Sequence, residues 1–140
     1  MFKWLKKLFE KQEDDYSDIQ KEHKRKFVEY LEEHKNDSPT LEAMYIIFNK
    51  QDIELAQLIR DNNLEVMYDH ILDDGYFEVF VQDENTILEQ VYVTVGIESN
   101  LPFINTQRVE EPIEINADMT AKEIVEFVIK EVKLQLIAIK

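Results

Sequence analysis

The chain contains no cysteine and only two glycines, Gly75 and Gly96. Without cysteine it has no disulfide framework, no thiol nucleophile and no thiolate metal site, which fits a reducing compartment. Two glycines 21 positions apart cannot form the glycine-rich loops that hold phosphate groups. We therefore expect no nucleotide cofactor of that kind, and no other pattern in the sequence predicts a cofactor.

Long apolar runs are also absent. Every apolar stretch is shorter than the ~20 residues that a bilayer-spanning helix needs. The N-terminus lacks the uninterrupted apolar core and the small-residue cleavage site of a secretory signal. These absences predict a cytoplasmic protein, with the inner face of the membrane as the alternative location.

Basic side chains are almost missing from residues 61–118. This stretch has 14 carboxylates and one basic residue, Arg108, so its net charge is −13, against −14 for the whole chain. Because a phosphate backbone is bound by clustered lysines and arginines, we expect no direct binding of nucleic acid. The surplus of acids predicts a negative surface that either binds a basic partner or serves only solubility. The residues predicted to form this surface are Asp73, Asp74, Glu78, Glu89, Glu98, Glu110, Glu111 and Glu114.

The first eleven residues have the opposite charge. They contain four lysines and one glutamate, a net charge of +3, and helical periodicity places their apolar side chains in one arc. Such a helix is suited to an anionic membrane surface or to a groove in a partner. Docking on the rest of the chain, or on a second copy in a homo-oligomer, remains an alternative. The residues predicted to make the contact are Phe2, Lys3, Trp4, Leu5, Lys6, Lys7, Leu8 and Phe9.

The chain is predicted to have three parts. Residues 1–11 form the basic amphipathic helix, residues 12–18 an acidic linker, and residues 19–140 a single acidic α+β domain. A helix is expected over about 19–35. Ser38 as N-cap and Pro39 at the first helical position then predict a helical hairpin with helices at 39–49 and 52–61.

The hairpin has a short resemblance to a known repeat. Ser38-Pro39-Thr40-Leu41, Ala43 and the segment from Asn49 to Ile59 resemble one ankyrin repeat over about 25 residues, with one extra residue in the opening turn. No second copy follows at a period of about 33, and a lone repeat cannot bury its own faces. The resemblance therefore implies no function.

The second half of the domain alternates between apolar and polar residues. Residues 64–72 fit either a helix or a strand, and we favour a helix. Period-two alternation predicts a β-hairpin of strands at 76–82 and 87–97, a third strand around Phe103 and a fourth from Pro112 to Asn116. Thr120 and Glu123 fit a capping box that opens a helix running to about residue 139. The predicted fold is α+β, with N-terminal helices, an antiparallel sheet of three or four strands and a C-terminal helix packed on the sheet.

No residues are arranged for catalysis or metal binding. His70 beside Asp69 is the nearest to an acid/base pair, but no motif places a nucleophile near it, so we expect a structural histidine. A calcium loop centred on Gly75 fails, because Leu72 and Val81 would stand where oxygen ligands are needed. We predict no metal site and no enzymatic activity; a small enzyme that uses carboxylates is the least favoured alternative.

These features predict a non-enzymatic, acidic protein-interaction module that binds a basic partner. The sharper form of this prediction is an inhibitor that mimics nucleic acid. The alternative function is that of a peripheral membrane protein attached through the helix at residues 1–11.

Overall fold

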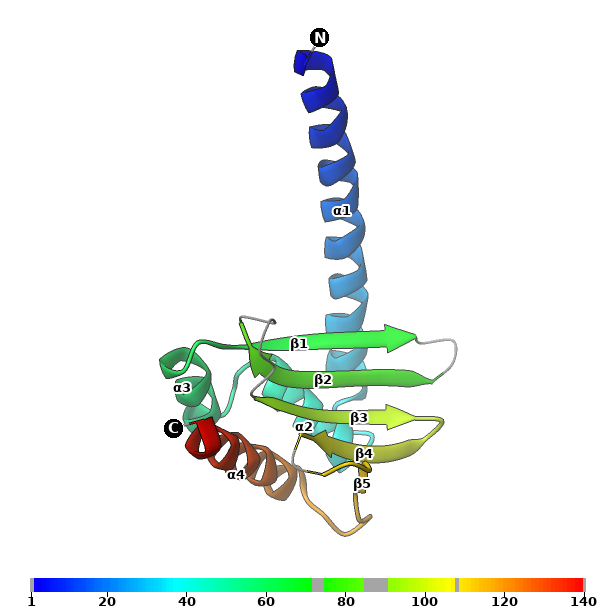
Figure 1. The fold of residues 1–140 in the computed structure, drawn as a ribbon. Helices are drawn as coiled ribbons and strands as arrows, with labels where there is room; N and C mark the ends of the chain where they lie inside the picture. The colour runs from blue at the N-terminus through cyan, green and yellow to red at the C-terminus, as the bar shows by residue number, and fades with distance from the viewer. Residues whose placement is uncertain (1, 72–74, 85–90, 108, 140) are drawn as a thin grey trace. The chain divides into compact units, whose positions relative to one another are not determined.

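The structure, a computed structural model of the 140-residue chain, describes residues 2–71, 75–84, 91–107 and 109–139, with side chains described between residues 18 and 138. The described chain has an α+β fold of four helices and one five-stranded antiparallel sheet (Figure 1). It divides into two compact units, residues 1–33 and 34–140. None of the described helices is long and apolar enough to cross a membrane.

The first unit is a single long helix, α1, which runs from Phe2 to His34. The helix passes through residues 12–18 without a break, so the predicted irregular linker is wrong about the backbone there. No glycine or proline occurs before Pro39, and nothing in the sequence therefore forces the helix to end earlier. The separate role predicted for residues 1–11 stays a prediction.

The helical hairpin is present close to its predicted bounds. Helix α2 runs from Pro39 to Phe48 and α3 from Ile53 to Asp61. The Ser38 hydroxyl accepts a hydrogen bond of 3.2 Å from the Leu41 amide, and the Asp52 carboxylate accepts one of 2.9 Å from the Leu55 amide. Both predicted N-caps are thus confirmed, because each satisfies an amide that has no partner within its helix.

The sheet is a meander with strand order β1-β2-β3-β4-β5, and all neighbouring strands are antiparallel. It has five strands, where the sequence predicted three or four. The bounds are Leu64–Ile71 for β1, Tyr76–Asp83 for β2, Tyr92–Glu98 for β3, Leu101–Thr106 for β4 and Ile113–Glu114 for β5. The predicted strand at 87–97 overlaps β3, and its residues 87–90 lie outside the described chain.

Strand β1 corrects the helix that we favoured for residues 64–72. Helix α3 ends at Asp61 with Asn62 as its C-cap, and Asn63 takes a left-handed conformation with φ of 54°, which redirects the chain. All eight residues of β1 then pair with β2, from Leu64 opposite Asp83 to Ile71 opposite Tyr76. A segment with an ambiguous pattern forms a strand because this pairing supplies partners for its backbone and buries Leu64.

The C-terminal helix α4 runs from Ala121 to Ile139 and begins at the predicted capping box. The Thr120 hydroxyl accepts a hydrogen bond of 3.1 Å from the Glu123 amide, and the Glu123 carboxylate accepts one of 3.4 Å from the Thr120 amide. Gln135 joins α4 to β3, since its side chain accepts from the Tyr92 amide at 2.7 Å and donates to the Tyr92 carbonyl at 3.2 Å. The predicted packing of this helix on the sheet is therefore confirmed.

The two faces of the sheet differ in chemistry. We call the face against which α2 and α4 pack the inner face (Figure 1); it is lined by fully buried side chains such as Val79, Val95 and Ile104. We call the opposite face the outer face, and its members follow from the strand register, because paired residues point the same way. The outer-face residues are Glu65, Met67, Asp69, Ile71, Tyr76, Glu78, Phe80, Gln82, Tyr92, Thr94, Gly96, Glu98, Leu101, Phe103, Asn105 and Glu114.

Two buried threonines, one on each face of the sheet, give a matched test of the assignment of the inner and outer faces. Thr94, on the outer face, is fully buried, and its hydroxyl has no hydrogen-bond partner in the described chain. Thr106, on the inner face, donates from its hydroxyl to the buried Glu131 carboxylate at 3.4 Å. We expect Thr94→Val to leave the free energy of unfolding unchanged or to raise it by up to about 1 kcal/mol, and Thr106→Val to lower it by about 1 to 3 kcal/mol.

Urea unfolding of the two variants measures this difference. A loss in Thr94→Val as large as that in Thr106→Val would contradict the assignment, because it would mean that the Thr94 hydroxyl makes a hydrogen bond.

Candidate protein-interaction surface

Neighbouring carboxylates on the outer face repel one another. Asp69 on β1 lies directly opposite Glu78 on β2, and Glu98 on β3 is the diagonal neighbour of Glu78. Like charges placed directly opposite on neighbouring strands destabilise a sheet by roughly 0.2 to 1 kcal/mol. None of the outer-face positions that the structure describes holds a lysine or an arginine, so no cation among these positions offsets the repulsion.

The environment of Glu78 shows the effect of this arrangement. Burial raises the pKa of its half-buried carboxyl group, and the charges of Asp69 and Glu98 raise it further. The Tyr76 hydroxyl, which donates a hydrogen bond to Glu78, acts in the opposite direction. The pKa of Tyr76 is itself raised, first by burial and then by the neighbouring Glu78 carboxylate. A cation placed over Glu78 would stabilise its ionised form.

This environment predicts a pH-dependent effect of Glu78→Gln. The native carboxyl has a higher pKa in the folded protein than in the unfolded chain, so stability is lost as pH rises above the ordinary value of 4.5. Glutamine stays uncharged and still accepts the hydrogen bond from Tyr76. We therefore expect the variant to match the native protein at about pH 3.5 and to be the more stable of the two at about pH 7, measured by urea unfolding. A gain that shrinks as pH rises would mean that the pKa of Glu78 is lowered.

Aromatic and apolar side chains fill the space between the carboxylates. The rings of Phe80 and Tyr92 lie 5.7 Å apart between centroids, at 45° to each other. The Phe103 ring lies over Gly96, because a Cβ atom added to that glycine would be 2.7 Å from Phe103 Cζ. Met67, opposite Phe80, is 39% exposed. Aromatic residues and methionine are enriched at protein interfaces, and aromatic faces attract lysine and arginine.

The structure brings together some of the predicted acidic residues and not others. Glu78, Glu98 and Glu114 lie on the outer face, whereas Glu110 and Glu111 are exposed in the connection between β4 and β5. Asp73, Asp74 and Glu89 lie outside the described chain. The predicted contact residues Phe2, Lys3, Trp4, Leu5, Lys6, Lys7, Leu8 and Phe9 have a helical backbone, and their side chains also lie outside the described part.

Sequence reasoning missed Asp69 and the outer-face aromatics. Asp69 was assigned to a helix, so its position opposite Glu78 could not be anticipated. The alternation of Leu64, Val66 and Tyr68 was the signal that could have found it, since a strand at these positions forms a hairpin with β2.

The strand also separates the two members of the only candidate acid/base pair. His70 is buried on the inner face, where its ring stacks on Tyr68 at 6.0 Å between centroids. Asp69 points to the outer face, because successive residues of a strand alternate between faces. Within the described residues, no group of three or more histidines and carboxylates is placed to hold a metal ion.

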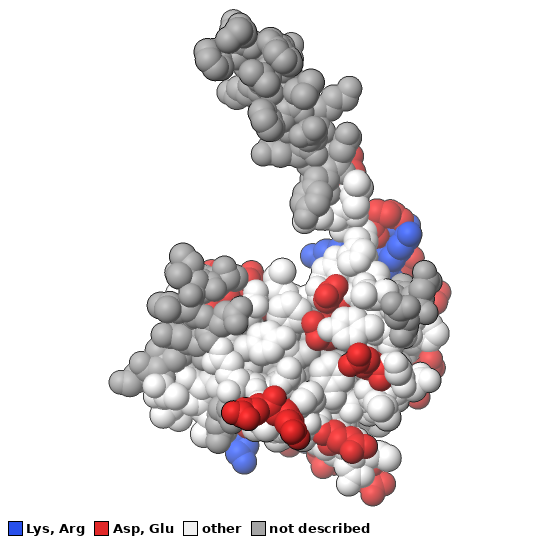
Figure 2. Space-filling model, turned by 45° about the vertical axis from the view of Figure 1, so that its right-hand side comes forward, with Lys and Arg blue, Asp and Glu red and all other residues white. Residues whose placement is uncertain are grey.

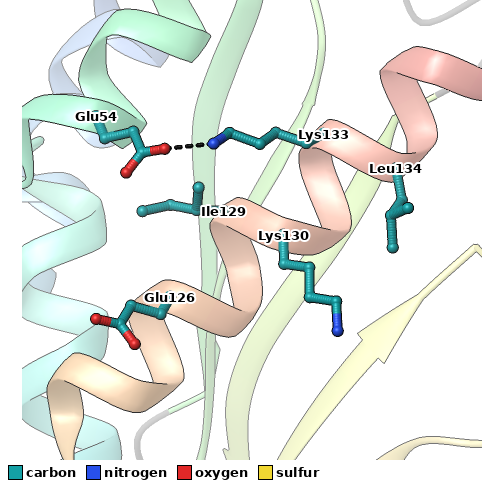
Figure 3. Close-up of a pocket in the computed structure, with 6 residues that line it drawn as sticks. All are labelled: Glu54, Glu126, Ile129, Lys130, Lys133 and Leu134. Atoms are coloured by element: carbon teal, nitrogen blue, oxygen red, sulfur yellow. Dashed lines mark hydrogen bonds and ion pairs between the residues drawn. The ribbon is translucent and has the colours of Figure 1, made fainter.

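A hollow lies between α3 and α4 (Figure 3). It has a volume of about 470 Å³, and Ile129 and Leu134 are among the residues that line it. The charges at its rim have both signs, and Lys133 forms an ion pair with Glu54 across it. The residues that line it include no serine, threonine or histidine, and we assign no function to it.

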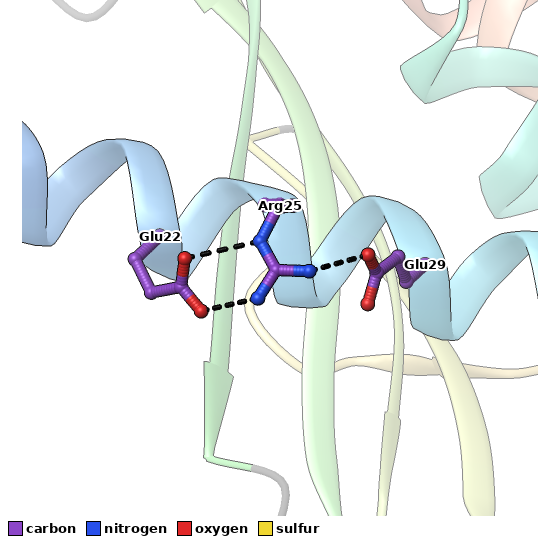
Figure 4. Close-up of polar contacts among 3 residues, drawn as sticks. All are labelled: Glu22, Arg25 and Glu29. Carbon is purple, nitrogen blue, oxygen red and sulfur yellow. Dashed lines mark hydrogen bonds and ion pairs between the residues drawn. The ribbon is translucent and has the colours of Figure 1, made fainter.

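The described part of α1 carries an exposed ion-pair network (Figure 4). Arg25 donates from Nε, at 3.0 Å, and from Nη2 to the two carboxylate oxygens of Glu22. Its Nη1 donates to a carboxylate oxygen of Glu29 at 2.6 Å. Exposed pairs of this kind are screened by solvent, contribute little to stability and are typical of a solvated helix face. Arg25 is therefore occupied within its own helix.

The charge on the second unit is mainly negative. Figure 2 shows carboxylates spread over an otherwise uncharged surface, with few lysine or arginine side chains among the coloured residues of the face that is drawn.

No protein-family model matches the chain, and neither the curated proteins nor the solved structures include a match. The assignment of a function therefore depends on the surface chemistry of the chain itself.

Proposed function

We propose that the protein is a non-enzymatic interaction module whose outer face binds a basic segment of another protein. The observation that carries the proposal is the position of Asp69 opposite Glu78, with Glu98 diagonal to Glu78 and no lysine or arginine among the described outer-face positions. Lysine or arginine side chains of a partner would relieve this repulsion and would also contact the aromatic rings nearby.

The repulsion favours binding over a role in solubility alone. Fully exposed acids, such as Glu110 and Glu111 outside the strands, promote solubility at no cost to the fold. Glu78 is half-buried and its pKa is raised, so its charge works against the folded state. A charged group that destabilises the free protein is explained by binding if a cation of the partner offsets its unfavourable charge in the complex.

A defined cationic probe tests the proposal. We expect a short fluorescent peptide of alternating lysine and serine to bind the full-length protein, measured by anisotropy, and to lose most of its affinity between about 0.05 and about 0.5 M salt. The matched peptide with glutamate in place of lysine should not bind. Absence of binding of the lysine peptide at low salt would contradict the proposal and favour solubility.

The partner itself can be sought once the probe has located the surface. Affinity capture from a lysate at low and at high salt gives the candidates, and duplex DNA then serves as competitor. If the captured proteins bind nucleic acid and DNA displaces them, the sharper proposal of a nucleic-acid mimic is supported. Capture that DNA does not affect would exclude mimicry and leave a basic protein segment as the target.

The helical backbone of residues 2–11 supports a second candidate function, that of a peripheral membrane protein. Each lysine near an anionic leaflet contributes about 1 kcal/mol to binding. The combined variant Lys3→Gln, Lys6→Gln and Lys7→Gln should therefore have about a hundredfold lower affinity for anionic vesicles, measured by co-sedimentation. Trp4 emission should shift to the blue on binding in the native protein. The matched variant, with Lys21, Lys24 and Lys26 changed to glutamine in the same helix, should bind as before. Equal binding by both variants would exclude this mode of attachment.

A further inference from the structure

Strand β1 is an edge strand of the sheet. In the strand order it pairs with β2 on one side, and no described strand pairs with its other side (Figure 1). All eight of its residues are in continuous register with β2, so the edge is long and has no bulge. The outer side of an edge strand presents amides and carbonyls that can form hydrogen bonds with an added strand.

The two edges of the sheet differ in protection. Natural proteins protect edge strands by making them short or by placing proline, lysine or a bulge in them. The opposite edge, β5, follows these rules, since it has two residues and Pro112 precedes it. Strand β1 has no proline, lysine or glycine, and its outer-face residues Met67 and Ile71 are 39% and 52% exposed. This edge therefore has the features of a binding edge.

The charges of β1 specify what it can accept. Its two outer-face carboxylates, Glu65 and Asp69, stand four residues apart, with Met67 midway between them. A strand added to β1 would place its own residues directly opposite these three, at the same period of two. Opposite charges at such positions stabilise the pairing, and an apolar residue suits the position opposite Met67.

We propose that the β1 edge takes up an extended segment of a partner protein, with lysine or arginine at two positions four residues apart and an apolar residue midway between them. This inference rests on the proposed function and specifies how the partner binds. The basic side chains lie opposite Glu65 and Asp69, and the residue opposite Asp69 stands two strand spacings, about 10 Å, from Glu78 on the far side of β1. A second copy of this chain is the less suitable occupant, because its β1 would bring further carboxylates to the junction.

Two peptides of identical composition test the spacing. Thr-Lys-Thr-Val-Thr-Lys-Thr carries both lysines and the valine on one face of a strand, whereas Thr-Lys-Thr-Val-Lys-Thr-Thr carries its lysines on opposite faces. Added to the full-length isotope-labelled protein at low salt, the first peptide should shift outer-face amide signals with at least tenfold higher affinity than the second. Equal affinities would overturn the proposed spacing.

Amide hydrogen exchange tests the strand addition itself. Saturation with the first peptide should slow exchange at alternate amides of residues 64–71 at least tenfold, while amides of β5 serve as an internal control. If the peptide shifts outer-face signals but leaves exchange in β1 unchanged, the edge inference fails and the proposed function stands. If no lysine peptide shifts these signals at low salt, the proposed function fails as well. Protection of β1 without peptide that rises with protein concentration would indicate a second copy and overturn the proposed occupant.

Discussion

Gly96→Ala is expected to lower the free energy of unfolding by about 1 to 3 kcal/mol, although the residue is small and the substitution adds one methyl group. The added Cβ would lie 2.7 Å from Phe103 Cζ and 3.0 Å from Glu78 Cβ, distances at which a neighbour must move. Because the Glu78 contact is to a Cβ atom fixed by the backbone, only the Phe103 ring can give way. The loss should appear as a shift of the urea midpoint without a change of slope.

The cause can be isolated with a double-mutant cycle. Phe103→Leu removes the ring atoms that approach Gly96, so the cost of Gly96→Ala should fall when both substitutions are combined. Gly75→Ala is the control, because Gly75 has a left-handed φ of 66° but no atom within 4 Å of the added Cβ. Its cost comes from the backbone alone and should not change with Phe103→Leu. Additive effects at Gly96 would contradict the placement of the Phe103 ring on the outer face.

Charge reversal on the outer face is expected to separate binding from stability. Asp69→Lys combined with Glu98→Lys should weaken binding of the lysine probe at least tenfold, because it replaces two of the carboxylates that attract the probe. The same variant should be at least as stable as the native protein, since Glu78 then has a cation opposite it and another on the diagonal. Anisotropy measures the first effect and urea unfolding the second.

The matched control makes the same change of charge elsewhere. Glu110→Lys combined with Glu111→Lys alters two exposed acids outside the strands. We expect this variant to bind the probe with nearly native affinity at moderate salt, because exposed charges separated by more than a Debye length of about 10 Å are screened. Equal losses of affinity in the two variants would mean that the net charge of the protein, and not the outer face, attracts the probe.

The elements with strong local signals were predictable from the sequence. Three helix starts are predictable from local chemistry. The short side chains of Ser38, Asp52 and Thr120 each accept a hydrogen bond from an amide in the first turn of a helix. Strand β2 has the buried apolar residues Phe77, Val79 and Val81 at every second position, and this period of two predicts the strand.

The errors lie where local signals were weak or misleading. Residues 64–71 fit both periods, and only the pairing with β2, which is a tertiary contact, makes them a strand. Residues 12–18 are polar and aperiodic, and this composition predicts a linker, although no residue there ends a helix.

The candidate site was predictable only in its charge. Composition predicted a negative surface with Glu78, Glu98 and Glu114 among its members, but a list of acids does not reveal which of them meet. The repulsion between Asp69 and Glu78 arises from the register of two strands, one of which was not predicted. The aromatic residues of the outer face were predicted as strand residues, and their exposure depends on which face the helices cover.

The most direct test of the central claim maps a basic probe onto the folded protein residue by residue. The isotope-labelled full-length chain is titrated with the lysine-and-serine peptide at low salt, and amide shifts are followed by NMR. The account predicts that the largest shifts fall on Asp69, Glu78 and Glu98 and on the strand residues beside them, and that they fade as salt is added. Shifts confined to Glu110, Glu111 and other exposed acids outside the sheet, with the outer-face strands unchanged, would contradict it.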